Sequence, residues 1–383
     1  MIPITKPSLN NSDFKYIKNV LKSKILTDGY YQKETELIIK KYIKSKFVAL
    51  TQSCTSALEI SAILLNLRKG DEVIMPSYGF VSLANSVVLR GAKPVFADID
   101  PQTLNISYHD IKRRITEKTK AIYVIHYAGN SCDIINIYNL AKKLNIYLIE
   151  DAAHSFLAKY KNKFLGTIGD IGVFSFHETK NLVGGQAGCI SINNLSLRRR
   201  INYILDKGTN RKKFLSNFRK KIIQPNKKGF YTWVDLGSEY RASELTSALL
   251  YSQMLKAKKI QKKRSLIWKK FNKFVSNLKT NEFYLVKPSK NTLSAFHLLV
   301  LVFKSRKISY DFINQMQKNK IAATFHYVPL HKSLMGKRFC KYKLPITENI
   351  YNRIVRLPLF SDLKTKELNK ILNSVKTFIN EQK

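Results

Sequence analysis

The feature that most constrains the fold is a regular alternation of short apolar runs with longer helical patterns in the first half of the chain. The apolar runs occupy residues 47–51, 73–76, 95–97, 121–125, 147–151 and 171–176. Runs of this length with turn residues at their ends are typical of buried strands. Strands that alternate with helices form a mostly parallel sheet that is covered on both faces. The sequence therefore predicts an α/β fold.

Two neighbouring runs are followed by residues that carry chemistry. The run at residues 147–151 ends in Asp151, and the run at 171–176 is followed by Lys180. Groups at the carboxyl ends of parallel strands face the crevice where open α/β sheets bind ligands. An amine for a Schiff base and a carboxylate that keeps a ring nitrogen protonated are the pair that pyridoxal phosphate requires. The simpler alternative is a solvated loop lysine and a helix-capping aspartate.

A third feature is the hydroxyl-rich turn at residues 52–56, between the first apolar run and the helical pattern at 57–67. Free N–H groups and the helix dipole make such a turn an anion site, to which Thr55 and Ser56 would add hydroxyl donors. A plain helix cap explains the same residues. Phe80 follows the run at 73–76, where an aromatic ring stacks on a flat cofactor or simply packs in the core.

The length of 383 residues predicts two domains. After residue 192 the pattern becomes helical, and we expect one long helix over residues 243–274. The predicted division is a large cofactor-binding domain at residues 1–245 and, at 246–383, a connecting helix with a smaller α+β domain. Residues 1–33 are expected to be irregular, with short helical patterns around the turn at 27–29.

The net charge of +41, from 67 Lys and Arg against 26 Asp and Glu, favours anionic partners such as nucleic acid. The basic residues are, however, spread along the whole chain. Their densest cluster, residues 211–228, has few aromatic residues for base stacking. We therefore interpret most of the charge as solvated surface and expect no specific nucleic-acid partner.

The remaining composition narrows the class of protein. No apolar run approaches the ~20 residues that span a bilayer, and the N-terminus lacks a signal-peptide pattern. We therefore expect a cytoplasmic protein without membrane contact. The four cysteines are widely scattered, which argues against a metal site and against a disulfide framework.

Four segments occur together in a characteristic order: residues 53–55, 70–78, 150–153 and 175–181. In this order and spacing they resemble the DegT/DnrJ/EryC1/StrS family of sugar-nucleotide aminotransferases, and the resemblance covers nearly the whole chain. It implies the aspartate-aminotransferase fold (fold type I), pyridoxal 5'-phosphate as cofactor, and a homodimer with a shared active site.

The resemblance also implies roles for individual residues. Lys180 would form the Schiff base and move the proton between cofactor and substrate carbons, while Asp151 would pair with the ring nitrogen. Phe80 would stack on the ring, and His154 would lie beside it. The residues expected to hold the phosphate are Thr55, Ser56 and Ser175.

The substrates implied are glutamate, which would leave as 2-oxoglutarate, and a nucleotide-linked 4-keto sugar in a ping-pong reaction. Segments 126–129, 207–211 and 231–233 look most like the branch that converts dTDP-4-oxo-6-deoxy-D-glucose to dTDP-4-amino-4,6-dideoxy-D-galactose for enterobacterial common antigen. A GDP- or UDP-linked sugar, or amination at C3, is the alternative. The residues expected to contact the substrate are His326, Tyr327, His331, Arg211 and Lys6.

Several positions depart from the family pattern. Gln186 and Ala187 stand where relatives have Glu and Gly, and we expect the alanine to restrict a backbone that glycine would leave free. Glu239 lies in a loop where many relatives have an asparagine that reaches the partner's cofactor phosphate. Gly79 replaces the usual threonine.

Two other functions fit parts of the sequence. Related sugar dehydratases replace the Schiff-base lysine with histidine, so Lys180 counts against that activity. A catalytically weakened, basic homologue that binds polyanions would account for the net charge and for the altered residues 185–188.

Overall fold

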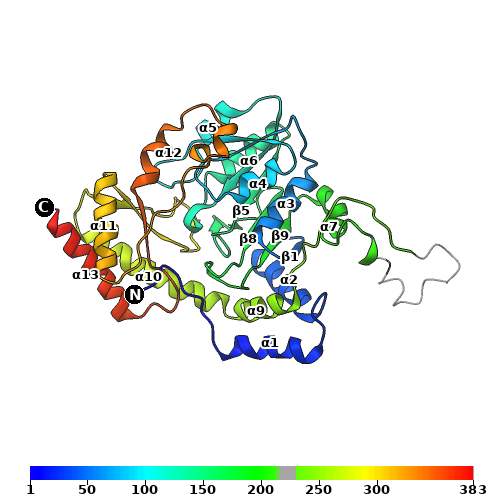
Figure 1. Cartoon of the computed structure of the whole chain (residues 1–383), viewed down its shortest axis with the longest axis horizontal. Helices are drawn as coiled ribbons and strands as arrows, with labels where there is room; N and C mark the ends of the chain where they lie inside the picture. Colours follow the sequence, from blue (N-terminus) through cyan, green and yellow to red (C-terminus); the bar gives the residue numbers. More distant parts are fainter. Residues whose placement is uncertain (213, 215–229, 383) are drawn as a thin grey trace.

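A seven-stranded sheet forms the centre of the computed structural model, which describes residues 1–212, 214 and 230–382 (Figure 1). The strand order is β1-β9-β8-β5-β4-β2-β3. The strands are β1 (Val48–Thr51), β2 (Glu72–Pro76), β3 (Lys93–Ala97), β4 (Thr119–Ile125), β5 (Tyr147–Asp151), β8 (Ile171–Ser175) and β9 (Gly188–Ile192). Within this sheet only β9 runs against the others, since it pairs antiparallel with both β1 and β8. The predicted α/β fold with a mostly parallel sheet is confirmed, although β9 was not predicted.

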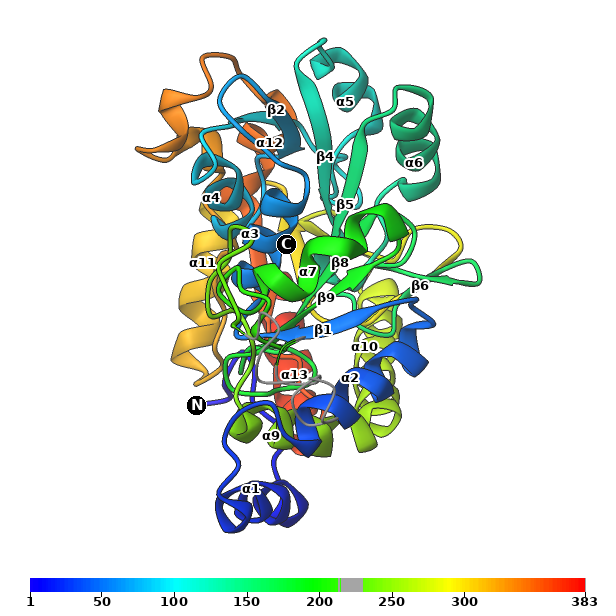
Figure 2. The same ribbon diagram turned by 90° about the vertical axis from the view of Figure 1, so that its right-hand side faces the viewer.

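Helices cover both faces of this sheet, because alternate residues of each strand point to opposite sides. In β4, Tyr123 and Ile125 pack with α3 (Cys54–Leu64), α4 (Ser82–Val88) and α7 (Arg198–Ile204). Ile122 and Val124 pack on the other face with α5 (Tyr108–Arg114) and α6 (Ile134–Lys143). Figure 2 shows the strands following one another across the molecule between these helices.

The N-terminal region contains two helices, α1 (Asn11–Ser23) and α2 (Tyr30–Ile43). They lie on either side of the predicted turn at 27–29, so the helical patterns expected there are confirmed, but the irregular structure is confined to residues 1–10 and 24–29. The Asn10 side chain accepts a hydrogen bond from the Ser12 N–H, and the Asp13 carboxylate accepts one from the Asn10 N–H. Asp13 also pairs with Lys256 at 2.6 Å. The pair joins α1 to the end of α9 (Glu244–Leu255), and Figure 1 shows these two helices side by side.

The helix expected over residues 243–274 is two helices, α9 and α10 (Ala257–Asn277), because the backbone leaves helical geometry at Lys256 (φ −108°, ψ 8°). α10 joins α11 (Arg306–Lys318) and α13 (Thr365–Glu381) around a second, antiparallel sheet of β10 (Phe283–Leu285), β12 (Leu299–Phe303) and β13 (Ile354–Leu357). Leu299 and Leu301 face these helices, whereas Val300 and Val302 face the core of the large sheet. The division at residue 245 stays a prediction.

The remaining elements are short. They are β6 (Lys159–Tyr160), β7 (Lys163–Phe164), β11 (Thr292–Leu293), α12 (Pro345–Ile350) and the 3₁₀ turns Tyr127–Gly129, Leu195–Leu197, Leu330–Lys332, Gly336–Arg338 and Tyr351–Arg353. The N-terminal segment reaches the second sheet region, where the Ile2 N–H donates to the Lys320 carbonyl at 2.8 Å and Ile4 accepts from Leu359. Among the described helices, none combines the length and apolarity needed to cross a membrane. Most of the basic cluster at 211–228 lies outside the described residues.

Candidate active site

A cavity of about 610 Å³ opens at the carboxyl ends of the parallel strands, where they meet the second sheet. Its polar and charged lining comes from eight separate segments: Thr5; Ser53, Cys54 and Thr55; Ser82; Asp151 and His154; Ser175, His177, Thr179, Lys180 and Gln186; His297; His326 and Tyr327; and Arg356. Phe80 lines it as well. The fold thus brings together eight of the predicted site residues: Thr55, Phe80, Asp151, His154, Ser175, Lys180, His326 and Tyr327.

Asp151 ends β5 and is buried, with 8 % of its surface exposed. Its Oδ1 accepts the Ala153 N–H at 2.9 Å, and no other described residue bonds to the carboxylate. Burial raises the pKa of Asp151, and the Ala153 N–H and the positive charge of Lys180 oppose that rise. A buried carboxylate with one free oxygen is ready to pair with a cationic group of a ligand.

Lys180 lies in the loop after β8, where its backbone N–H donates to the His177 carbonyl at 2.9 Å. Burial lowers the pKa of the Lys180 amine, and the nearby Asp151 partly restores it. A lowered pKa increases the fraction of neutral amine, which is the form that acts as a nucleophile and as a general base.

The residue after the lysine ties this loop to the second half of the chain. The Asn181 amide donates to the Ala295 carbonyl at 2.8 Å. Its oxygen therefore faces His297, whose Nδ1–H donates to it at 2.8 Å. The loop that carries Lys180 is thus tied to residues 295–297, more than one hundred residues further along the chain.

The start of α3 forms the polar end of the cavity. Ser53 caps the helix by accepting the Ser56 N–H at 3.0 Å, and the Thr55 hydroxyl contacts that of Ser82 at 2.8 Å. The N–H groups of Cys54 and Thr55 lie in the first helical turn and have no partner among the described residues. They remain free to bind an anion. Ser56 bonds to Ser53 and does not line the cavity.

Gly188 on β9 permits this arrangement, because a Cβ there would lie 2.4 Å from the Cys54 nitrogen. The backbone at the start of α3 therefore rests directly on β9. Gly185, in the preceding loop, carries a positive φ of 83°. Ala187 is buried and has no positive φ, so the backbone at this position does not need the conformational freedom of glycine. Gln186 and Ala187 both line the cavity.

Three buried histidines and a tyrosine line the same cavity as the lysine. The rings of His154 and His297 lie 4.4 Å apart, and His326 stacks on Tyr327 at 3.6 Å. Burial lowers the pKa of all three imidazoles well below the usual value, and the positive charges around them add to this effect. The buried Nδ1 of His154 has no partner among the described residues. This orphaned atom points to a ligand that supplies one.

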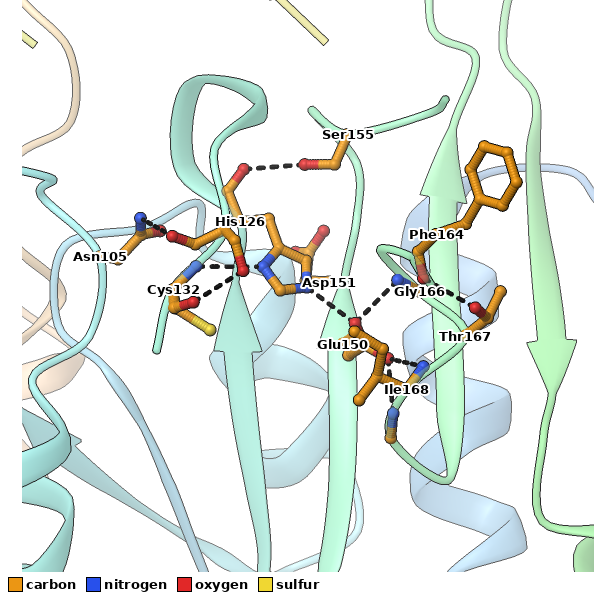
Figure 3. Close-up of polar contacts among 12 residues, drawn as sticks. Asn105, His126, Cys132, Glu150, Asp151, Ser155, Phe164, Gly166, Thr167 and Ile168 are labelled. Carbon is orange, nitrogen blue, oxygen red and sulfur yellow. Dashed lines mark hydrogen bonds and ion pairs between the residues drawn. The ribbon is translucent and has the colours of Figure 1, made fainter. Parts of the chain in front are cut away.

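A second polar cluster lies beneath Asp151, and Figure 3 shows its hydrogen bonds. The fully buried His126 and Glu150 meet at 2.9 Å, and Glu150 also accepts N–H groups of Gly166, Ile168 and Gly169. The backbone N–H of His126 donates to the backbone carbonyl of Asp151 at 3.1 Å. The cluster therefore fixes the end of β5 that carries Asp151.

The other predicted substrate residues lie outside the cavity lining. His331 is buried, with Nδ1 2.6 Å from the Ser77 hydroxyl and Nε2 3.3 Å from Glu348. Lys6 and Arg211 are exposed on the surface. Their contact with a substrate stays a prediction.

Glu239 and Gly79 are two further positions where the sequence departs from the family pattern. Glu239 forms an ion pair with Lys207 and does not line this cavity. The missing threonine side chain at Gly79 leaves room for Ile125, whose Cδ1 would lie 2.4 Å from a Cβ there.

Sequence reasoning missed Arg356, His297 and Ser82, which all line the cavity. The sequence contains one sign of a special role for Arg356, because it is the single charged residue in the otherwise apolar segment 354–360. It contains no such sign for His297 and Ser82, because each lies far in sequence from the residues that it joins.

A sequence profile of the DegT/DnrJ/EryC1/StrS aminotransferase family matches residues 7–376 of this chain. The chain belongs to this family. Aminotransferases of the DegT/DnrJ/EryC1/StrS family depend on pyridoxal phosphate, and the protein is a sugar aminotransferase of this class. The implied family, fold and cofactor are confirmed.

Individual relatives match over their full length. An uncharacterized protein of Methanocaldococcus jannaschii is 32% identical over 390 residues, with 100% of this chain and 98% of the relative covered. GDP-perosamine synthase of Escherichia coli O157:H7 is 28% identical over 384 residues, with 100% of this chain and 99% of the relative covered. The crystal structure of the aminotransferase TlmJ from Streptoalloteichus hindustanus superimposes with a TM-score of 0.90 at 24% identity, covering 100% of both chains.

The cavity fits pyridoxal phosphate in three respects. It offers an amine of lowered pKa at Lys180 and a carboxylate with a free oxygen at Asp151. It also offers the unpaired N–H groups at the start of α3 and the hydroxyls of Thr55 and Ser82. The backbone of α3 can lie there because Gly188, which packs against it, has no side chain. These are the donors that an aldehyde, a pyridine nitrogen and a phosphate need.

Proposed function

We propose that this protein transfers the amino group of glutamate to the C4 ketone of a nucleotide-linked 4-oxo-6-deoxyhexose for surface-polysaccharide synthesis. The observation that supports it best is the convergence of Lys180 and Asp151 on one cavity of about 610 Å³. Pyridoxal phosphate, when bound, supplies the carbonyl that takes up the amino group and the ring that withdraws electrons.

The residues of the chain would then do four things. Asp151 keeps a proton on the ring nitrogen, because a buried carboxylate stabilises an adjacent cation. The start of α3, with Thr55 and Ser175, holds the phosphate. Phe80 would stack on the ring, and His154 would lie beside it.

Lys180 is the proposed catalytic base. Its amine takes the proton from the donor carbon and returns it to the new position, which requires a neutral amine. Burial lowers the pKa of this amine. The clamp between Asn181 and His297 holds the lysine loop in place during this transfer.

The nucleotide is the finer point of the proposal. The segments that resemble the dTDP branch, residues 126–129, 207–211 and 231–233, line no part of this cavity. Trp233 in the last segment is 75% exposed. A relative of the whole chain is named as a GDP-perosamine synthase. We therefore place a GDP-linked sugar first and a dTDP-linked sugar second.

A homodimer is part of this proposal. Large apolar side chains are exposed on α1 and in the loop after residue 229, among them Phe14, Leu21, Phe230 and Trp233. Exposed apolar groups in such numbers are typical of surfaces that another protein covers. Sedimentation equilibrium at micromolar concentration should give twice the 44.2 kDa chain mass.

The substrate assay offers GDP-, dTDP- and UDP-linked 4-oxo-6-deoxyhexoses separately, with glutamate as donor, and compares kcat/KM. The proposal predicts amino-sugar product with the nitrogen at C4 and the highest efficiency for the GDP-linked sugar. A preference for the dTDP-linked sugar would support the second candidate. Product with nitrogen at C3, or no product from any of the three, would contradict the proposal.

A further inference from the structure

The segment just before β12, residues 294–297, is held by side chains rather than by secondary structure. It belongs to no helix or strand, yet each of its four backbone carbonyls accepts a hydrogen bond from a side chain. Gln261 on α10 bonds to the first carbonyl at 2.9 Å, and Asn181 of the lysine loop bonds to the second. The third and fourth carbonyls are both bonded to Arg264.

Arg264 lies on α10 and is buried, with 3% of its surface exposed. Its Nε–H donates to the Phe296 carbonyl at 3.1 Å, and its Nη2–H donates to the His297 carbonyl at 2.6 Å. No ion pair within residues 1–212, 214 and 230–382 includes this guanidinium. Burial lowers the pKa of Arg264 to about 9, because a buried charge without an opposite charge is destabilised. Two successive backbone carbonyls are thus its anchor.

The backbone at Phe296 explains why an arginine is needed here. Phe296 has a positive φ of 48°, which a residue with a side chain adopts only with strain. A guanidinium presents several N–H groups in a fixed plane and can bond two neighbouring carbonyls at once, whereas a lysine ammonium is a single point of charge. Arg264 therefore stabilises a strained turn immediately before His297.

His297 follows this turn and lines the cavity. Its Nδ1–H donates to the side-chain oxygen of Asn181 at 2.8 Å. Burial lowers the pKa of His297, and the positive charges around it, that of Arg264 among them, add to this effect. The imidazole is therefore neutral, and its single N–H is used for Asn181.

These contacts form one continuous path from α10 to the lysine. The Arg264 guanidinium fixes the backbone of His297, and the His297 ring fixes the side chain of Asn181. Asn181 is the neighbour of Lys180 in the chain. We propose that Arg264 is a positioning residue that sets the place of Lys180 through these two contacts. The proposal deepens the proposed function and rests on the role of Lys180 as the base.

The location of Arg264 decides which kinetic step it affects. Arg264 does not line the cavity, so it has no direct contact with a ligand there. A base displaced by about 1 Å can lose about 100-fold in rate, because proton transfer requires the base within hydrogen-bond reach. Loss of Arg264 should therefore slow proton transfer and leave the affinity for the amino donor unchanged.

The test uses two variants of this residue and a matched control. Arg264→Lys keeps a buried cation but not the forked pair of bonds, and Arg264→Met removes the charge and both bonds. The control is Arg353→Lys, since Arg353 also donates to two backbone carbonyls, those of Asn349 and Lys304, and does not line the cavity. Urea unfolding identifies conditions in which each variant is folded. If Arg264→Met does not fold, Arg264→Lys provides the test.

The first readout needs neither substrate nor turnover. In protein with nitrogen-15-labelled histidine, only seven side chains give imidazole NMR signals. We expect a slowly exchanging Nδ1–H signal of His297, assigned by its loss in His297→Gln, in the wild type and in Arg353→Lys. In Arg264→Lys and Arg264→Met this proton should exchange at least about 10-fold faster, because the segment opens more often. An unchanged exchange rate would overturn the proposal.

The second readout is the single-turnover rate of the cofactor-loaded protein at saturating glutamate. Arg264→Lys should lower this rate about 10-fold and leave the half-saturating glutamate concentration unchanged. Because Arg264 acts through Asn181, the double variant with Asn181→Ala should also be about 10-fold slower than the wild type. A loss of about 100-fold in the double variant would show that the two residues act independently and would overturn the proposal.

The two readouts separate this proposal from the proposed function. If the wild type reacts with glutamate and Arg264→Lys reacts equally fast, the positioning role is wrong while the proposed function stands. If glutamate leaves the wild-type cofactor spectrum unchanged, the proposed donor is wrong. The same cycle, run with an amino acid that does bleach the cofactor band, then decides the role of Arg264.

Discussion

The carboxylate of Glu150 and the imidazole of His126 form a fully buried pair, with 2.9 Å between Oε2 and Nε2, one residue before the cavity aspartate. The Cys132 N–H donates to His126 Nδ1 at 3.4 Å, so Nδ1 is the acceptor and Nε2 carries the hydrogen. Glu150 accepts four hydrogen bonds in all (Figure 3). A buried carboxylate with four donors is satisfied, and it anchors the end of β5.

The variant Glu150→Gln tests this anchor. An amide would place N–H hydrogens against N–H donors, so the free energy of unfolding should fall by about 3 kcal/mol. Glu117→Gln, at an exposed position, should change it by less than about 0.5 kcal/mol. Urea unfolding measures both, and equal stabilities of the two variants would show that the pair contributes little.

The Asn181 clamp should matter for turnover more than for cofactor binding. Asn181→Ala removes the bonds to Ala295 and His297, which frees the lysine loop. We expect kcat to fall about 10-fold, because a misplaced base loses general-base catalysis. Asn136→Ala, at an exposed position of α6, is the control. A wild-type kcat in Asn181→Ala would rule out this positioning role.

These two networks show what the sequence could and could not predict. Asp151, Lys180 and Thr55 were found because each lies at the end of a strand, or within five residues after it, and the strand is revealed by its own apolar run. His297 and Arg356 reach the same cavity from the region of the second sheet. Local sequence patterns do not predict such contacts, because the contacting residues lie more than one hundred positions apart in the chain. The break at Lys256 was missed because the apolar pattern continues through it, and β9 was missed because Gly188 and a glycine-rich loop obscure its start.

Gly188 should be intolerant of any side chain. In Gly188→Ala the methyl group would meet backbone atoms of Ser53 and Cys54 at 2.4 Å, so the start of α3 must shift. We expect unfolding to become easier by about 2 kcal/mol and the Kd for pyridoxal phosphate to rise about 10-fold. Gly70→Ala meets no atom within 4 Å but has a φ of 100°. It should cost about 1 kcal/mol and leave the cofactor Kd unchanged.

The stability should fall in mild acid. The pKa values of His154, His297 and His326 lie well below 6.5, so these side chains stay neutral in the folded protein while the unfolded chain takes up protons near pH 6.5. The unfolded state then binds more protons, and the free energy of unfolding decreases as the pH falls below 6.5. Each histidine should contribute a slope of about 1.4 kcal/mol per pH unit.

The variant His154→Gln checks this slope, since it removes one of the three contributions. Urea unfolding between pH 7 and about pH 5 should give a shallower pH dependence than in the wild type. His109→Gln, at an exposed position, should retain the wild-type slope. Parallel curves for His154→Gln and the wild type would contradict the lowered pKa of His154.

The central claim is that Lys180 and Asp151 hold pyridoxal phosphate for amino transfer. The most direct measurement is the absorbance spectrum of the purified protein before and after glutamate, beside Lys180→Ala. We predict a visible cofactor band in the wild type that glutamate bleaches and a 4-oxo-6-deoxyhexose nucleotide restores, and a different, unresponsive spectrum in the variant. No band in the wild type after added pyridoxal phosphate, or the same bleaching in Lys180→Ala, would contradict the account.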